Sequence, residues 1–183
     1  SCLPKTAWPP TYHYTQKETS AQDFLPSIWS NFAVSGTYQP GSTFKPIFAA
    51  AALDTGSITA FDSFTCNASY LYYDQPFKCA FYEAHGTQTI RSIIQNSCNV
   101  GMIQVSERVS AEAYYAYQCA FGIGEKTGID LPYEESSANL VYDEDSLGPI
   151  ELATVSFGQG FNLTPIQLLT AESACVNDGN LVQ

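Results

Sequence analysis

An apolar helix that begins with a serine and a lysine constrains this sequence more than any other feature. Residues 47–53 (IFAAAAL) are apolar throughout and Gly56 follows them, so we expect a buried helix over residues 42–55. Ser42 lies at the mouth of this helix, and Lys45 follows three positions later on the same helical face. The two side chains can therefore touch.

This Ser-x-x-Lys pattern is compatible with an activated nucleophile. A serine hydroxyl attacks readily only when a base takes its proton, and burial among apolar side chains disfavours the ammonium form of a lysine. Ser42 is therefore a candidate nucleophile and Lys45 its candidate base. The same residues also fit a simple N-cap before a buried helix, because Ser-x-x-Lys often occurs by chance.

The composition excludes several classes of function. The chain has 183 residues, 45% of them hydrophobic, which is enough for one domain with a real core. Its formal net charge of −11 would repel a phosphate backbone, so we expect no nucleic-acid partner. The longest apolar run, residues 47–53, is far shorter than the roughly 20 residues that cross a bilayer.

Helical and irregular patterns alternate along the chain. Residues 1–38 lack periodicity, and the aromatic and polar residues 57–88 predict an extended excursion. Further helices are expected over residues 89–96, 100–109, 110–120, 149–157 and 165–177, with a loop over 123–148 and a strand starting at 181.

Ser97 and Asn99 form a second polar pair, on a tight turn between two predicted helices. A hydroxyl and a carboxamide placed in this way can face one cleft. The hydroxyl could relay a proton while the amide holds a carbonyl or amide group of a substrate. Alone, Ser-x-Asn is too common to carry weight, but it follows Ser-x-x-Lys and stands among several longer strings.

Six stretches of the chain match one known family in the family's own order. They are residues 37–46 (TYQPGSTFKP), 85–89 (HGTQT), 96–99 (NSCN), 122–132 (GIGEKTGIDLP), 156–160 (SFGQG) and 164–169 (TPIQLL). In these stretches the chain resembles the transpeptidase domain of penicillin-binding proteins, most closely the class B, monofunctional type of elongation or sporulation. The resemblance implies the α/β (α+β) fold shared with serine β-lactamases, in which helices pack on a mainly antiparallel sheet. This chain would supply mainly the helical part.

The resemblance implies a peptidoglycan D,D-transpeptidase that cross-links stem peptides through an acyl-serine intermediate. Ser42 would attack the penultimate D-alanine carbonyl, and its backbone N–H would form half of an oxyanion hole. Lys45 would be the base, Ser97 the proton relay and Asn99 a ligand for the substrate backbone. β-Lactam antibiotics would acylate the same serine. The implied location is the outer face of the bacterial membrane, with the anchor outside this chain and a membrane glycosyltransferase as partner.

One motif of the family is missing, namely a Lys-Thr/Ser-Gly sequence on an edge strand. Residues 126–128 (KTG) have the right letters but lie in a Gly-rich loop and belong to a different string of the family. The true motif should lie beyond Gln183 and the first core strands before Ser1. We therefore expect residues 1–183 to be part of a transpeptidase domain, which could be inactive by itself.

Two alternatives use the same serine and lysine. A serine β-lactamase needs a carboxylate for deacylation, and Glu135 and Asn139 have the spacing of that enzyme's loop. Residues 134–145 also fit a solvated acidic loop, which we favour because the strings at 85–89 and 156–160 belong to transpeptidases. The non-enzymatic alternative is a β-lactam sensor, which stalls as the acyl form.

Three of the six cysteines, Cys66, Cys79 and Cys98, could join His85 in a tetrahedral metal site. The resemblance strengthens this hypothesis, because some elongation- and sporulation-type transpeptidases carry metal ligands at these positions. We predict one structural zinc ion, which would pin the turn that carries Ser97. The alternatives are a Cys66–Cys79 disulfide and unligated thiols.

The other cysteines carry no such prediction. Cys119 and Cys175 lie in predicted helices and are expected to be inert core thiols, while Cys2 lies near the start of the sequence and is not interpreted.

Overall fold

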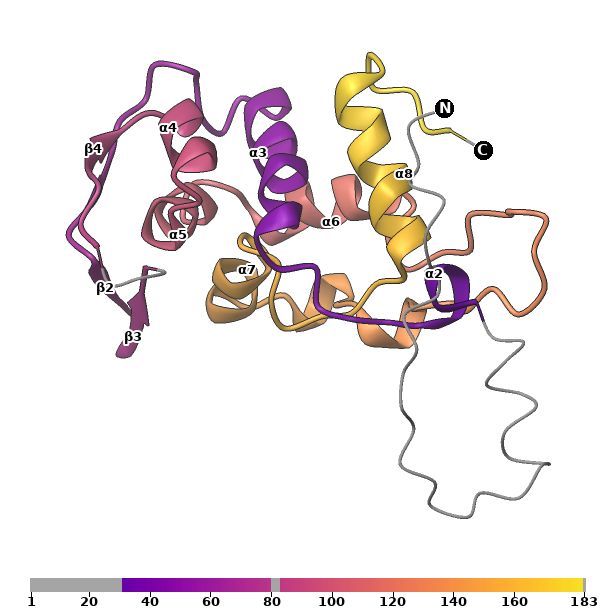
Figure 1. The fold of residues 1–183 in the computed structure, drawn as a ribbon. Coiled ribbons are helices and arrows are strands. Elements are labelled where there is room, and N and C mark those ends of the chain that lie inside the picture. The colour runs from indigo at the N-terminus through magenta and orange to yellow at the C-terminus, as the bar shows by residue number, and fades with distance from the viewer. Residues whose placement is uncertain (1–30, 80–82, 183) are drawn as a thin grey trace, which may run out of the picture. The chain divides into compact units, whose positions relative to one another are not determined.

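The computed structural model describes residues 31–79 and 83–182 (Figure 1). Most of the segment predicted to be irregular, residues 1–30, lies outside this range, and so does Cys2. Within the range, the irregular prediction is wrong for the short helix α2 (Phe32–Ser35). Its N-cap Asn31 accepts a hydrogen bond from the backbone of Ala33, a local side-chain effect that hydrophobic periodicity does not reveal.

Helix α3 (Lys45–Asp54) is the central element, and the chain enters it through the 3₁₀ turn η1 (Gly41–Phe44). This confirms the helix predicted over residues 42–55. Pro46 is tolerated because it lies in the first turn, and Gly56 ends the helix with φ +69°. Figure 1 shows α3 between α8 on one side and α4 and α5 on the other, and α6 also packs against it.

The other predicted helices are also confirmed. They are α4 (Ile90–Gln95), α5 (Asn99–Ser106), α6 (Ala111–Ala120), α7 (Pro149–Val155) and α8 (Pro165–Val176). The predicted loop between α6 and α7 holds only two 3₁₀ turns, η3 (Ala138–Leu140) and η4 (Glu144–Ser146). Helix α8 begins with a capping box, in which Thr164 and Gln167 each accept a hydrogen bond from the other's backbone N–H. No helix among the described residues is long and apolar enough to cross a membrane.

Four short strands form two antiparallel pairs within the predicted extended excursion. Strand β1 (Phe64–Cys66) pairs with β4 (Gly86–Gln88), and β2 (Ser69–Tyr72) pairs with β3 (Gln75–Lys78) in a hairpin. Helices with small antiparallel sheets agree with the predicted α/β class. The strand predicted from residue 181 is wrong for residues 181–182, which pair with no strand in the described part of the chain.

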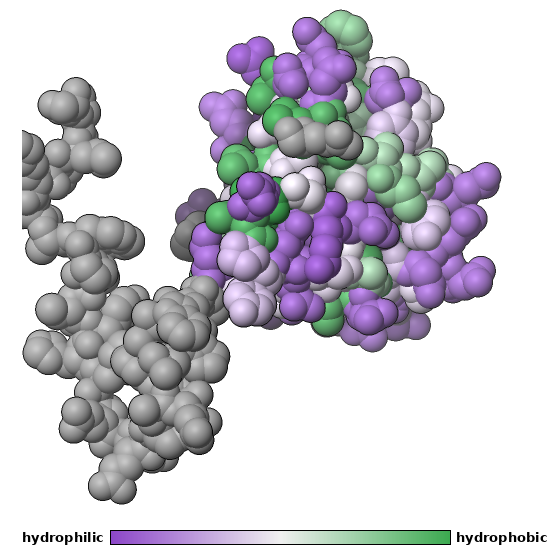
Figure 2. Space-filling view, turned by 90° about the vertical axis from the view of Figure 1, so that its right-hand side faces the viewer, coloured by the Kyte–Doolittle hydropathy of each residue, from purple (hydrophilic) through white to green (hydrophobic). Residues whose placement is uncertain are grey.

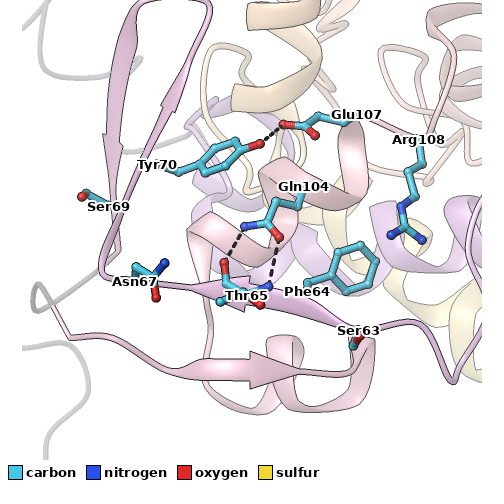
Figure 3. A pocket seen from close by; sticks show the side chains of 9 residues that line it. All are labelled: Ser63, Phe64, Thr65, Asn67, Ser69, Tyr70, Gln104, Glu107 and Arg108. Atoms are coloured by element: carbon cyan, nitrogen blue, oxygen red, sulfur yellow. Dashed lines mark hydrogen bonds between the residues drawn. The ribbon is translucent and has the colours of Figure 1, made fainter.

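Helix α5 ties the strands to the helical core. The side-chain amide of Gln104 bonds to both backbone groups of Thr65 in β1. Its Oε1 accepts from the Thr65 N–H at 3.1 Å, and its Nε2 donates to the Thr65 carbonyl at 2.6 Å (Figure 3). Tyr70 of β2 donates to Glu107 at 2.7 Å. The residues that form these bonds line an open cavity, and its polar groups pair largely with one another. These hydrogen bonds join the strands to α5.

The surface differs from expectation at one cysteine. Cys119 is exposed, so its prediction as a core thiol is wrong. The buried stripe of α6 consists of Tyr114 and Gln118, and the next residue already turns about 100° away from the core. Cys175 is half-buried and packs against the core.

Apolar side chains also reach the surface. Leu169 and Val176 of α8 are 58% and 88% exposed, and one face of the molecule shows hydrophobic areas among hydrophilic ones (Figure 2). Helix α8 therefore presents apolar side chains that the described residues do not cover.

A close backbone contact fixes the chain just before Ser42. The Gly41 N–H donates to the Gly158 carbonyl at 2.8 Å. Gly158 has φ +79°, and a Cβ added there would lie only 1.9 Å from the Gly41 carbonyl oxygen. The glycine in the string at 156–160 is therefore required for the approach of these two segments.

We expect Gly158→Ala to lower the free energy of unfolding by about 2–5 kcal/mol, because overpacking adds to the cost of a left-handed alanine. Gly179→Ala is the matched control, since Gly179 has φ +77° but nothing within 4 Å of an added Cβ. It should cost only about 1–2 kcal/mol. Equal losses for the two variants in urea unfolding of the full-length protein would show that the contact with Gly41 is not tight.

Candidate active site

The four side chains predicted as an active site meet at the start of α3. Lys45 Nζ lies 3.2 Å from Ser42 Oγ, 2.9 Å from Ser97 Oγ and 2.8 Å from Asn99 Oδ1. It also donates to the Ser97 carbonyl oxygen at 2.6 Å. One amine therefore connects Ser42 of η1 with Ser97 and Asn99 at the turn between α4 and α5.

Burial sets the charge of that amine. The Lys45 side chain is 1% exposed and stands among buried apolar side chains, including Phe44 and Phe48. Desolvation lowers the pKa of Lys45 from 10.5 to about 8, although thiolate charge at Cys79 and Cys98 would act in the opposite direction. A neutral Lys45 is thus accessible close to physiological pH.

Ser42 combines exposure with a fixed position. Its residue is exposed to solvent, whereas Phe44 and Lys45 behind it are buried. Gly41 adopts φ +61° immediately before it, and the bond to Gly158 holds this turn. The hydroxyl is therefore open to an incoming molecule while its amine partner is shielded from water.

Ser97 lies in a strained turn that ends α4. Its φ is +50°, a conformation that glycine usually supplies at this position. The N–H groups of Ser97 and Cys98 bond back to the carbonyls of Ile94 and Ile93 at 3.1 and 2.9 Å. A non-glycine residue here costs about 1–2 kcal/mol, and such strain is concentrated at functional sites.

Cys98 links this turn to a cluster of sulfur and nitrogen atoms. Its Sγ caps α5 by accepting from the Gly101 N–H at 3.2 Å, and it lies 3.5 Å from Cys79 Sγ. Cys79 Sγ lies 3.5 Å from His85 Nδ1, and the ligand atoms of these residues and Cys66 all lie within 4.8 Å of one another. All four predicted metal ligands are therefore brought together.

The cysteines of this cluster are free thiols, so the alternative Cys66–Cys79 disulfide is not formed in this structure. Burial raises the pKa of Cys98 to about 12, against the Gln88 side chain and the Gly101 N–H, which lower it. For Cys66, burial is the largest influence and raises the pKa, but hydrogen bonds with His85, Ala68 and Cys98 together outweigh it, so the net shift is downward.

The two look-alike motifs form hydrogen bonds elsewhere in the described part of the chain. Thr127 and Gly128 donate their backbone N–H groups to Glu134, so residues 126–128 form a loop and not a strand, as predicted. The Glu135 N–H bonds to the Val34 carbonyl, and residue 137 bonds to α8. Among the described residues, no hydrogen bond joins this loop to Ser42 or Lys45.

Sequence reasoning missed the part that the β2–β3 hairpin plays. Asn99 Nδ2 lies 3.5 Å from the Lys78 carbonyl oxygen, and Phe77 meets Phe157 edge to face with ring centroids 6.3 Å apart. The hairpin therefore borders the site. Local periodicity does not relate these residues, because the contacts join β3 to segments distant in the sequence.

Comparison with known proteins identifies the family. Residues 6–183 match the sequence model described as the penicillin-binding protein transpeptidase domain. The chain belongs to this transpeptidase family. The match covers nearly the whole chain and includes every motif of the candidate site.

Curated relatives of this transpeptidase chain agree with the family. It is 40% identical to stage V sporulation protein D of Bacillus subtilis over 162 residues, which cover 87% of this chain and 25% of that protein. It is 34% identical to the probable peptidoglycan D,D-transpeptidase PenA of Neisseria gonorrhoeae, over 83% of this chain and 25% of that protein. The chain spans about a quarter of the length of these relatives.

Solved structures confirm the transpeptidase fold. Penicillin-binding protein 3 of Mycobacterium tuberculosis in complex with ampicillin superposes with a TM-score of 0.73 at 31% identity, over 82% of this chain and 33% of that one. A peptidoglycan synthetase from Bifidobacterium adolescentis gives 0.77 at 31% identity, over 87% of this chain and 28% of that one. The predicted fold class is therefore confirmed.

Titration of Lys45 tests the electrostatics of the site. Since burial lowers its pKa, we expect the Lys45 amine to lose its proton with a midpoint of about 8 in the folded protein. The unfolded chain then binds more protons between about 8 and 10.5, so Lys45 should make stability rise with pH in that window. Nitrogen NMR of labelled full-length protein, with Lys45→Met to assign the signal, would measure the midpoint; a value near 10.5 contradicts a desolvated amine.

Proposed function

We propose that this chain supplies the nucleophile and base of a peptidoglycan D,D-transpeptidase that cross-links stem peptides through an acyl-serine. The observation that carries the proposal is the buried Lys45 amine, which reaches Ser42, Ser97 and Asn99 at once. Relatives named as peptidoglycan D,D-transpeptidases support it. The oxygen nucleophile, its base and a second hydroxyl are the groups that acyl transfer requires.

Acylation begins when neutral Lys45 takes the Ser42 proton as Oγ attacks the penultimate D-alanine carbonyl. The developing oxyanion faces the Ser42 N–H, which lies in the first turn of η1, where helical N–H groups have no partner within the helix. When the peptide C–N bond breaks, Ser97 passes a proton to the leaving D-alanine amine. Ser97 Oγ already contacts Lys45, so the proton has a short route.

Deacylation reverses these roles. The amine of a neighbouring stem peptide attacks the acyl-serine carbonyl, gives up a proton through Ser97 and Lys45, and leaves Ser42 as a free hydroxyl. Asn99 presents its Oδ1 to Lys45, which leaves its Nδ2 to hold the substrate backbone beside the Lys78 carbonyl. We also place the protein at the outer face of the bacterial membrane, where its substrate lies, beside a glycosyltransferase that makes the glycan strands.

Penicillin labelling tests this function. A fluorescent penicillin should acylate the full-length protein, and Ser42→Ala should abolish labelling, whereas Ser57→Ala, a serine bonded to Thr55, should not. Lys45→Met keeps the side-chain volume but removes the base, so the acylation rate should fall about 10²–10⁴-fold.

The fate of the acyl-enzyme separates the alternatives. A transpeptidase should hold the penicillin and should form cross-linked product from a stem peptide and an amine acceptor. Rapid release of hydrolysed penicillin would instead indicate a β-lactamase. A stable acyl form with no product from any acceptor would indicate a sensor.

We further propose that Cys66, Cys79, His85 and Cys98 hold one structural zinc ion. Three thiols and an imidazole are ligands that zinc prefers. Zinc–sulfur bonds of about 2.3 Å place tetrahedral sulfur atoms about 3.8 Å apart, and the Cys79 and Cys98 sulfurs lie 3.5 Å apart. A bound ion would supply a structural link between the strands and the turn at Ser97, without a role in the chemical steps.

Native mass spectrometry of the full-length protein, without reductant or chelator, would detect this ion. We expect a zinc-sized mass increment that is lost on denaturation and is absent in Cys79→Ser. The control Cys119→Ser should keep the increment, because Cys119 is exposed and outside the cluster. A protein without the increment and two hydrogens lighter would contain a disulfide, which would overturn the metal proposal.

A further inference from the structure

Gln88 carries a buried N–H group that has no hydrogen-bond partner. It is the last residue of β4 and is 4% exposed. Its Oε1 accepts from Asn96 Nδ2 at 3.0 Å, but its Nε2 has no acceptor. Buried donors are almost always paired in native proteins, so this orphan requires an explanation.

The sulfur of Cys98 is the candidate acceptor for this N–H group. The Gln88 side chain interacts with this thiol, and the bond from Asn96 to Oε1 leaves the amide nitrogen as the end that is free to face it. A neutral thiol is a weak acceptor, whereas a thiolate is a strong one. The orphan N–H therefore fits a cluster in which Cys98 is a metal-bound thiolate.

The backbone explains why a residue at this position could matter. Gln88 and His85 lie on one short stretch of chain, and β4 pairs with β1, where Gly86 is opposite Cys66. On the other side, Asn96 ends α4 and Cys98 caps α5. Cys66 belongs to β1, and His85 directly precedes β4. A bond from Gln88 to Cys98 would fasten this strand pair to the turn that presents Cys98.

We propose that Gln88 is a positioning residue that donates its Nε2–H to the Cys98 thiolate when a divalent ion occupies the cluster. The inference rests on the metal site proposed above. Gln88 acts through Cys98 and touches neither substrate nor metal, as the outer partners of metal ligands commonly do. It thereby fixes the sulfur that lies between Ser97 and Asn99.

The variant Gln88→Glu removes the donor. It keeps an oxygen that can accept from Asn96 but replaces the N–H that faces Cys98. In the full-length protein, we expect zinc affinity, measured by competition with a chromophoric chelator, to fall about 10–100-fold. With cobalt(II) in place of zinc, the sulfur-to-cobalt charge-transfer band should move to longer wavelength, because a thiolate without its N–H donor releases electron density more easily.

Gln118→Glu is the matched control. Gln118 is also 4% exposed, but its Nε2 donates to the Tyr142 carbonyl at 2.7 Å and not to the cluster. It should lower folding stability without changing zinc affinity or the cobalt spectrum. Gln88→Leu lacks the donor without adding a carboxyl group. It should therefore show the same loss of zinc affinity and the same shift of the cobalt band, and it replaces Gln88→Glu if that variant does not fold.

The outcomes separate this inference from the metal proposal. If the unaltered protein binds zinc and the Gln88 variants match it in affinity and cobalt spectrum, Gln88 has no positioning role. Equal losses of zinc affinity in Gln88→Glu and Gln118→Glu would mean general destabilisation and would also overturn the inference. If the unaltered protein binds neither zinc nor cobalt, the metal proposal itself fails, and this inference fails with it.

Discussion

The buried amine of Lys45 is the interaction on which the rest of the site depends. A lysine charge taken out of water is strongly unfavourable unless acceptors surround it. Here the acceptors are oxygens of Ser42, Ser97 and Asn99, and the bonds to the last two span 52 and 54 residues of sequence. The hydrogen bonds that offset the desolvation of the amine therefore also hold α3 against the turn between α4 and α5.

These hydrogen bonds require the turn to hold its acceptor oxygens in fixed positions. Ser97 occupies a left-handed conformation, so the surrounding structure has to impose it. The backbone bonds at the end of α4 and the cap from Cys98 to Gly101 do so locally. Helix α5 then anchors the turn, because Val100 and Ile103 are fully buried in the core. Local strain at the site is thus balanced by packing behind it.

The sequence predicted what depends on local spacing, and it missed what depends on contacts across the fold. Helical periodicity placed α3 to α8 correctly, and the strings around Ser42 and Ser97 predicted side chains that the structure brings together. Helical periodicity also placed Cys119 in the core, where it does not lie. The sequence of an apolar helix does not reveal which of its sides packs against other elements. The sequence did not predict the approach of Gly158 to Gly41 or the unpaired amide of Gln88. Each depends on segments that are distant in the sequence and packed together in the fold.

The spacing of three between Ser42 and Lys45 has its own physical reason. The chain enters α3 through a 3₁₀ turn, and in that geometry residues i and i+3 lie directly in line. Helical side chains also lean toward the N-terminus, so the buried Lys45 reaches back along the axis to Ser42 Oγ at 3.2 Å. An exposed nucleophile and a desolvated base can therefore be neighbours on one short segment. A spacing of four would suit a regular α-helix and would take the lysine out of line with the serine at this turn.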